Sequence, residues 1–167
     1  MKENLIILGA GQYSYVVAEI AATMGCFGEI DFLDDNSEKA IGRIDELGKL
    51  KGKYSYGAVA IGNPSLRAEL MQRLEESGYE VAKLVHPMAF VSPTAKIGKG
   101  AVIEPMAVVQ ANSVIGEGSI VSSGAVIRHN GTVGSFCHCD CGSVVMSGAV
   151  VGDKTKIPCG EIYKTLN

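Results

Sequence analysis

Three groups of residues in this chain have the side chains or backbone groups that chemistry requires. His129 is the first, because an imidazole has an unperturbed pKa of about 6.5 and accepts a proton near neutral pH. The second is Cys137–Cys141, a run of cysteines that includes His138 and has the composition of a metal site. The third is Gly9-Ala10-Gly11, a glycine-rich turn of the kind that can hold phosphate. What each group can do depends on the elements that position it.

The second half of the chain has a fixed period of six residues. Thirteen hexads follow one another without insertion from Val85 to Ile162, and the first position is Val or Ile in all but the one that begins with Cys139. The fifth position is small in all but the last hexad. A period of eighteen is superimposed, marked by Gly98, Gly116, Gly134 and Gly152. Three hexads make one triangular coil, and stacked coils satisfy each other's backbone at a spacing of about 4.8 Å. The pattern predicts a parallel β-helix over residues 85–162, with a tail at 163–167.

The first half alternates apolar strands with amphipathic helices. Strands are predicted at residues 5–8, 27–33, 58–61 and 80–85, and helices at 13–24 and 65–77. Residues 36–56 are polar and poorly patterned, and are assigned only to a loop or short helix. The alternation predicts a small parallel sheet, a Rossmann-like α/β subdomain of the mononucleotide-binding type over residues 1–84. Asp34 and Asp35 follow the second strand, where they could hydrogen-bond a ribose or a base, or form a solvated acidic turn.

The hexad phase places His129 at an outward-pointing third position on a corner. Ser147 follows eighteen residues later, so it lies on the same corner one coil away, at a backbone distance of about 5 Å. A base and a backbone oxyanion donor on adjacent coils have the geometry that acyl transfer needs. Asn130 occupies the fourth position, where Gly or Asn is frequent and a positive φ is expected. Its simplest interpretation is a turn residue.

The same phase argues against a metal site. Cys137 and Cys139 fall at the two inward positions and are predicted to be core thiols, while His138 and Cys141 point in other directions. We therefore predict no metal. Cys141 and Cys159 are eighteen residues apart and should be stacked neighbours, either as free thiols or as a disulfide formed on oxidation.

Composition excludes other classes of function. The net charge of −3, a pI near 5.6 and the lack of a Lys/Arg cluster argue against nucleic-acid binding. No apolar stretch has the length of a signal peptide or a membrane span. Five cysteines without a secretion signal predict reduced thiols and a cytoplasmic protein.

The motifs resemble those of a known family. The hexads are similar to the left-handed β-helix of the hexapeptide-repeat acyltransferases. The segments LIILGAG, FLDD, AIGN and LVHPMAFVSPTAKIGKG resemble the bacterial nucleotide-aminosugar N-acetyltransferases and the sialic-acid O-acetyltransferase-like proteins grouped with them. This resemblance implies a left-handed helix, a homotrimer, acetyl-CoA in the groove between neighbouring helices, and a nucleotide-sugar substrate on the N-terminal subdomain.

The resemblance also implies roles for particular residues. His129 would deprotonate the attacking amine or hydroxyl, His138 would lie at the thioester end of CoA, and the backbone N–H of Ser147, beside Gly148, would receive the oxyanion. The implied substrate-binding residues are Gly9, Gly11, Gln12, Tyr13, Asp34, Asp35 and Asn63. Three departures stand out: Gln12-Tyr13-Ser14 replaces the family's Gly-His-Gly, Asn130 replaces an acid, and the hexads end early, at Ile162.

Two functions therefore follow from the sequence. The first is acetyl transfer from acetyl-CoA to an amino or hydroxyl group of a nucleotide-linked sugar. The alternative is a non-catalytic trimeric module that binds a nucleotide sugar or pairs with an intact transferase, with CoA binding lost. Acyl transfer to a small free acceptor is weaker, because it leaves the N-terminal subdomain unused.

Overall fold

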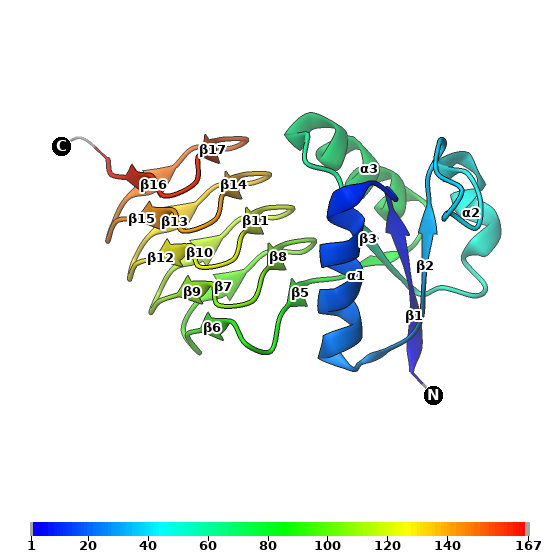
Figure 1. Cartoon of the computed structure of the whole chain (residues 1–167), viewed down its shortest axis with the longest axis horizontal. Helices are drawn as coiled ribbons and strands as arrows, with labels where there is room; N and C mark the ends of the chain where they lie inside the picture. Colours follow the sequence, from blue (N-terminus) through cyan, green and yellow to red (C-terminus); the bar gives the residue numbers. More distant parts are fainter. Residues whose placement is uncertain (1, 166–167) are drawn as a thin grey trace. The chain divides into compact units, whose positions relative to one another are not determined.

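A computed structural model describes residues 2–165 of the chain (Figure 1). Residues 166 and 167 of the predicted tail lie outside the described part. The chain divides into two compact units, residues 1–82 and 83–167. Within residues 2–165, every helix is too short or too polar to cross a lipid bilayer.

The first unit is built on a four-stranded parallel sheet in the order β2-β1-β3-β4. Its elements are β1 (Glu3–Leu8), α1 (Gln12–Met24), β2 (Phe27–Leu33), the 3-10 turn η1 (Ile44–Glu46), α2 (Leu47–Leu50), β3 (Tyr56–Val59), α3 (Pro64–Glu76) and β4 (Glu80–Val81). The central strand β1 pairs with both β2 and β3, and its last four side chains are fully buried. In α1 the buried residues recur at helical spacing, at Ser14, Val17, Ile20 and Ala21. The predicted Rossmann-like α/β subdomain is confirmed.

Two of the predicted strands are placed differently. The single strand predicted at 80–85 is wrong: β4 ends at Val81 and β5 (Leu84–Val85) belongs to another sheet. Ala82 N donates to Gly57 O in the first unit, whereas Leu84 N donates to Ala101 O in the β-helix. The third strand begins and ends two residues earlier than the predicted 58–61. The strand does not continue to Ile61, because the Arg67 guanidinium donates hydrogen bonds to the carbonyl oxygens of Ile61 and Gly62.

The second unit is a parallel β-helix of two-residue strands. They are β5 (Leu84–Val85), β6 (Phe90–Val91), β7 (Lys96–Ile97), β8 (Val102–Ile103), β9 (Val108–Val109), β10 (Val114–Ile115), β11 (Ile120–Val121), β12 (Val126–Ile127), β13 (Thr132–Val133), β14 (His138–Cys139), β15 (Val144–Val145), β16 (Val150–Val151), β17 (Lys156–Ile157) and β18 (Ile162–Tyr163). Each pairs with the strand eighteen residues away, for example Val114 with Thr132. The predicted left-handed β-helix of hexad coils is confirmed.

The strands stack into three faces, which Figure 1 shows as ladders along the helix. We call the ladder β5, β8, β11, β14, β17 the first face, the ladder β6, β9, β12, β15, β18 the second face, and the ladder β7, β10, β13, β16 the third face. Each coil visits them in that order. In a three-sided coil, the corner between the second and third faces lies across the core from the first face.

Close stacking explains the sequence pattern. First-position side chains from Ile103 to Ile157 are buried in one core with the small fifth-position residues. Every fourth position from Gly100 to Gly160 has a positive φ, and Met106, Phe136 and Lys154 adopt this conformation although they are neither Gly nor Asn. Of the eighteen-residue glycines, Gly98, Gly116 and Gly134 are required by space: a Cβ on Gly116, for example, would lie 2.5 Å from the backbone of the next coil.

Candidate active site

His129 and Ser147 lie on one corner of the helix, on adjacent coils. His129 follows β12 and Ser147 follows β15, so both stand between the second and third faces. Gly148 N donates to His129 O at 3.2 Å, and Asn130 N donates to Ala111 O at 2.9 Å in the coil before. The structure therefore brings the backbone of His129 next to that of Gly148, on the same corner as Ser147, as the spacing of eighteen predicts. We call this the His129 corner.

His129 is exposed, and two amide side chains contact it, one at its backbone and one at its ring. Its backbone N donates to Gln110 Oε1 at 3.0 Å, which ties the turn to the preceding coil. Its Nδ1 lies 3.1 Å from Nδ2 of Asn130, a residue with φ of 58°. Asn130 thus has two roles: it forms the positive-φ turn, as predicted, and it also contacts the ring of His129.

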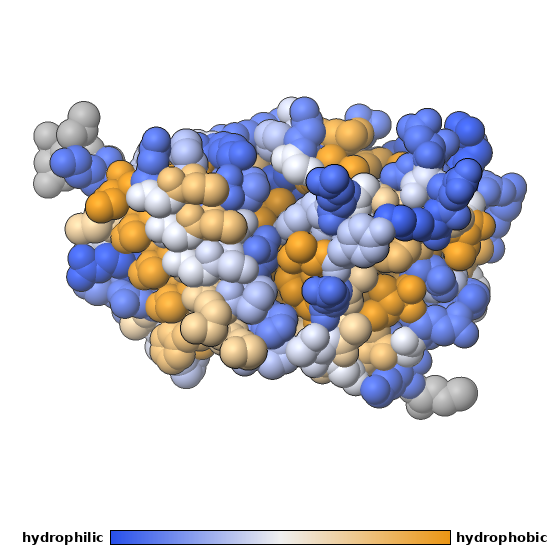
Figure 2. Space-filling model, in the orientation of Figure 1, coloured by the Kyte–Doolittle hydropathy of each residue, from blue (hydrophilic) through white to orange (hydrophobic). Residues whose placement is uncertain are grey.

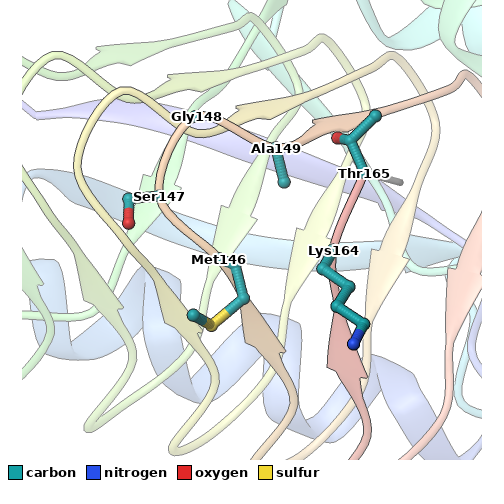
Figure 3. Close-up of a pocket in the computed structure, with 6 residues that line it drawn as sticks. All are labelled: Met146, Ser147, Gly148, Ala149, Lys164 and Thr165. Carbon is teal, nitrogen blue, oxygen red and sulfur yellow. The ribbon is translucent and has the colours of Figure 1, made fainter. Parts of the chain in front are cut away.

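A shallow pocket of about 140 Å³ adjoins the corner. It is lined by Met146, Ser147, Gly148, Ala149, Lys164 and Thr165 (Figure 3). Gly148 has φ of 72° and open space where a Cβ would stand, so the peptide is accessible from outside. Thr165 Oγ1 accepts a hydrogen bond from Val150 N at 3.0 Å, which holds the last described residue against the coil that contains Ser147 and Gly148.

His138 is not brought to the His129 corner. It begins β14 on the first face, on the other side of the helix core. Its Nε2 lies 3.0 Å from Ser122 Oγ and 3.9 Å from Asp140 Oδ1. The hydrogen bond from Cys141 N lowers the pKa of Asp140 to about 2, and Asp140 also pairs with Lys156 at 3.2 Å. One chain alone therefore cannot present His129 and His138 to the same small group.

The cysteines of the 137–141 run lie where the hexad phase predicts. Cys137 and Cys139 are fully buried in the helix core, and burial raises the pKa of the Cys139 thiol to about 12. Cys141 and Cys159 are exposed on adjacent coils, joined by the bond from Gly160 N to Cys141 O at 2.9 Å. Among residues 2–165, no three Cys, His, Asp or Glu side chains gather as metal ligands would.

In the first unit, the glycine turn after β1 is closed by an aspartate. Asp34 Oδ2 accepts a hydrogen bond from Ala10 N at 2.8 Å, and this bond is the largest cause of the lowered pKa of Asp34. Gly9 has φ of 100°, and a Cβ there would lie 2.7 Å from the Ile61 side chain. Gly11 is the N-cap of α1 and provides no side-chain hydrogen bond, and the positive end of the helix dipole there favours an anion.

The predicted substrate residues gather at the carboxyl ends of the strands. Gln12 and Tyr13 begin α1 after β1, and Asn63 caps α3 after β3, accepting bonds from Ser65 N and Leu66 N at 3.0 Å each. Because β1 and β3 are neighbours at the point where strand order reverses, these ends form the crevice where such sheets bind ligands.

Asp35 lies in a different environment, since its Oδ1 accepts a bond from Ile44 N at 3.1 Å and is 3.8 Å from Arg43 Nε. Its carboxylate therefore stabilises the 36–44 loop.

Sequence reasoning missed two buried charged residues. Arg67 is 2% exposed and its Nη1 donates to Ile61 O at 2.9 Å and Gly62 O at 2.8 Å, which shapes the turn before Asn63. Glu104 is 6% exposed and contacts Ser122 and Ser123 on the next coil. The sequence held one signal for Glu104: it lies eighteen residues before Ser122 and 36 before Asp140, so the three residues stack on successive coils. For Arg67 the only signal was its position in the first turn of a predicted helix.

Comparison with known proteins gives matches in both units. Residues 4–74 match the family described as the PglD N-terminal domain, and residues 94–129 match the bacterial transferase hexapeptide family (six repeats). A curated relative, UDP-N-acetylbacillosamine N-acetyltransferase of Bacillus subtilis, is 30% identical over 111 residues, which cover 60% of this chain. The match spans about half, 51%, of that relative's length.

Solved structures resemble the chain over almost its whole length. The acetyltransferase domain of PglB from Neisseria gonorrhoeae, in complex with acetyl coenzyme A, is 32% identical with a TM-score of 0.76, and the match covers 97% of this chain and 96% of that one. A histidine-to-asparagine mutant of perosamine N-acetyltransferase from Caulobacter crescentus, in complex with CoA and GDP-perosamine, has a TM-score of 0.81 at 22% identity, covering 96% of this chain and 88% of that one. The second likeness is one of fold.

Proposed function

Because this chain belongs to the hexapeptide-repeat acetyltransferases with a PglD-type N-terminal domain, we propose that it transfers an acetyl group from acetyl-CoA to the amino group of a nucleotide-linked sugar. An amine is favoured over a hydroxyl because the relatives with named activities are N-acetyltransferases. The observation that carries the proposal is the His129 corner, where exposed His129 and the Ser147-Gly148 turn lie on adjacent coils and are joined by the bond from Gly148 N to His129 O.

In this mechanism His129 is the general base. Nε2 takes a proton from the sugar amine as its nitrogen attacks the thioester carbonyl, and the imidazolium returns that proton to the departing thiolate. A lone pair on Nε2 requires the hydrogen to be on Nδ1, where Asn130 accepts it through Oδ1 after a half-turn of its amide. A positioned base of this kind contributes about 10²–10⁴ in rate.

The backbone N–H of Ser147 stabilises the oxyanion. It donates a hydrogen bond to the carbonyl oxygen as negative charge develops there, while the open space at Gly148 admits the acetyl group and the adjoining pocket holds the start of the pantetheine arm. Removing one such donor in other acyl-transfer enzymes costs about 10²–10³ in kcat.

A homotrimer completes this site. His138 lies on the first face, across the core from the His129 corner, so a second copy must supply it to the acetyl group held by the first. The outward residue of every strand on the second face is apolar: Phe90, Val108, Val126, Val144 and Ile162. Phe90 is 58% and Ile162 65% exposed, and Figure 2 shows apolar side chains in a stripe over the stacked coils. An exposed apolar ladder of this kind favours burial against another copy.

The first unit would hold the nucleotide. The N-terminus of α1 after Gly9 and Gly11 offers N–H groups to a phosphate, and Gln12, Tyr13 and Asn63 stand at the same crevice. Asp34 supports the turn through Ala10 N, and Asp35 would act only through the 36–44 loop. We place the reaction in the cytoplasm, because five free cysteines suit a reducing compartment.

The alternative is the non-catalytic trimeric module, which Asn130 favours because it brings no charge to His129. A thiol-release assay separates the two functions: purified protein is mixed with acetyl-CoA and a panel of UDP- and GDP-linked amino sugars. We expect turnover that falls about 10²–10⁴-fold in His129→Ala. Turnover that is equal in His129→Ala would overturn the mechanism. Calorimetry that detects nucleotide-sugar binding but no CoA binding would establish the module.

A further inference from the structure

A buried carboxylate lies on the β-helix away from the His129 corner. Glu104 follows β8 and is 6% exposed. Its Oε1 accepts a hydrogen bond from Ser122 Oγ at 3.2 Å, and its Oε2 accepts bonds from Ser123 N at 3.0 Å and Ser123 Oγ at 3.2 Å. The residues below it in the same column are Ser122, Asp140 and Pro158, so the stacking of coils does not itself demand an acid there. Removing a carboxylate from water is costly, which calls for a reason beyond packing.

Ser122 joins this carboxylate to His138. Ser122 is 3% exposed, and its Oγ lies 3.0 Å from His138 Nε2. Glu104, Ser122 and His138 therefore form a line across three successive coils of the first face. Asp140 Oδ1 lies 3.9 Å from the same Nε2, too far for a hydrogen bond, and Asp140 Oδ2 pairs with Lys156.

The direction of the hydrogens in this line follows from Glu104. An ionised carboxylate only accepts hydrogen bonds, so the single Ser122 O–H must donate to Glu104 Oε1. The Ser122 oxygen is then the acceptor toward His138, and Nε2 must carry a hydrogen to donate to it. In the neutral ring, the lone pair is consequently on Nδ1.

We propose that Glu104 is a positioning residue for the reaction: acting through Ser122, it fixes His138 as the tautomer with hydrogen on Nε2 and the lone pair on Nδ1. This rests on the function proposed above, because His138 can take part in the reaction only if an acetyl donor lies against the first face. The role of His138 toward that donor then falls to Nδ1. Neutral Nδ1 accepts a hydrogen bond from an amide of the pantetheine arm, and protonated Nδ1 donates one to the thioester. No proton leaves Glu104 in either case.

The line is not a serine nucleophile with its base. The Ser122 hydroxyl is buried and its hydrogen is directed at Glu104 rather than at the imidazole. Both Ser122 and Asp140 approach the ring at Nε2, whereas a catalytic triad needs its carboxylate at the other ring nitrogen.

Glu104→Gln tests the direction of the line with almost no change of shape. Ser123 N must still find an acceptor, so the amide oxygen of the glutamine takes the place of Oε2 and the NH₂ takes the place of Oε1. That NH₂ donates to Ser122, whose O–H then turns to His138 Nε2. The substitution should therefore move the His138 hydrogen from Nε2 to Nδ1.

The readout is ¹⁵N NMR of histidine-labelled protein at neutral pH, which distinguishes the two tautomers and has only three histidines to assign. We expect Nε2–H in the wild type, Nδ1–H in Glu104→Gln, and loss of the fixed tautomer in Ser122→Ala. Glu117→Gln, at a different corner, where Glu117 pairs with Lys99 at 3.4 Å, is the matched control and should leave His138 unchanged. Nδ1–H in the wild type, or the same tautomer in all four proteins, would overturn the proposal.

Kinetics separates a positioning role from a purely structural one. Glu104→Gln should lower kcat about tenfold to a hundredfold, less than loss of the general base, with the KM for the sugar nucleotide unchanged. Introduced into His138→Ala, the same substitution should have no further effect, because the residue through which it acts is gone. If the tautomer changes while kcat does not, Glu104 has no part in catalysis and the proposed function stands. If the wild type has no transferase activity, the NMR result still decides whether Glu104 sets the tautomer, and the proposed function fails by itself.

Discussion

Replacing Asn130 by Asp should change the pH dependence of the reaction in a predictable direction. The amide of Asn130 lies 3.1 Å from Nδ1 of His129, and Asp tolerates the same positive φ of 58°. The substitution therefore puts a negative charge beside the imidazole without a new backbone strain. A carboxylate there stabilises the protonated ring by charge attraction.

The size of the effect follows from the exposure of both side chains. Opposite unit charges about 4 Å apart interact by about 1 kcal/mol in water and by more where solvent is partly excluded. An interaction of about 1.4 kcal/mol with the protonated ring changes the equilibrium between its two forms about tenfold, which corresponds to about one pH unit. Because the base must be neutral to accept a proton, the acidic limb of the kcat profile should move up by about one pH unit. Near pH 6 the variant should be several-fold slower than wild type, and above pH 8 it should match or exceed it.

The assay is thiol release from acetyl-CoA at saturating substrates between pH 5 and 9. Asn112→Asp, one coil away in the same column and also at positive φ, is the control. The charge added by Asn112→Asp lies farther from the His129 ring, so the acidic limb should move less in this variant, and the movement should vanish in high salt. An acidic limb that stays in place or moves down in Asn130→Asp would refute the reasoning, because His129 would then not be the group whose protonation stops the reaction.

Three other predictions follow from the packing. Gly116→Ala should destabilise the helix by about 1–3 kcal/mol in urea denaturation, because the new Cβ would lie 2.5 Å from the next coil. Gly152→Ala is the control and should cost much less, because its Cβ would lie 3.9 Å from the nearest atom. Equal losses of stability would contradict the stacking argument. Asp34→Asn should destabilise the protein at pH 7, and the deficit should shrink as pH falls below 3.8. The hydrogen bond from Ala10 N lowers the folded-state pKa of Asp34, so its stabilisation is fully present above 3.8 and is lost as pH falls through the folded value. A deficit in urea denaturation that does not change between pH 7 and pH 2 would contradict this. Val126→Glu puts a charge in the middle of the apolar second face and should give monomers in light scattering. The control Glu117→Gln should stay trimeric. A trimeric Val126→Glu would mean that another surface holds the copies together.

The β-helix was predictable because its physical constraints repeat. Branched residues at the first hexad position, small ones at the fifth and glycines every eighteen residues fix both the coil and its register, so the relation between His129 and Ser147 could be counted from the chain. The strand predicted at 80–85 failed for the opposite reason. Val81, Leu84 and Val85 are apolar in either sheet, and only the hydrogen bonds made by Ala82 and Leu84 assign them to different units.

The site was harder to predict wherever a side chain binds backbone far along the chain. Asp34 was predicted as a possible ribose ligand, yet its carboxylate also accepts from Ala10 N, 24 residues away. Glu104 was overlooked because a corner position is expected to face solvent, and only the neighbouring coil reveals its contacts with Ser122 and Ser123. Pattern and period cannot report such contacts, since they depend on where a side chain reaches rather than on its spacing.

The central claim is that His129 of one copy and His138 of another act on the same acetyl group. Mixed trimers test it most directly: His129→Ala and His138→Ala proteins, each nearly inactive, are unfolded together and refolded at equal amounts. With sites shared between copies, about a quarter of the interfaces in random trimers join an intact His129 to an intact His138, so about a quarter of wild-type activity should return. If both histidines act from one copy, every site lacks one of them, and the mixture should stay as inactive as its parents.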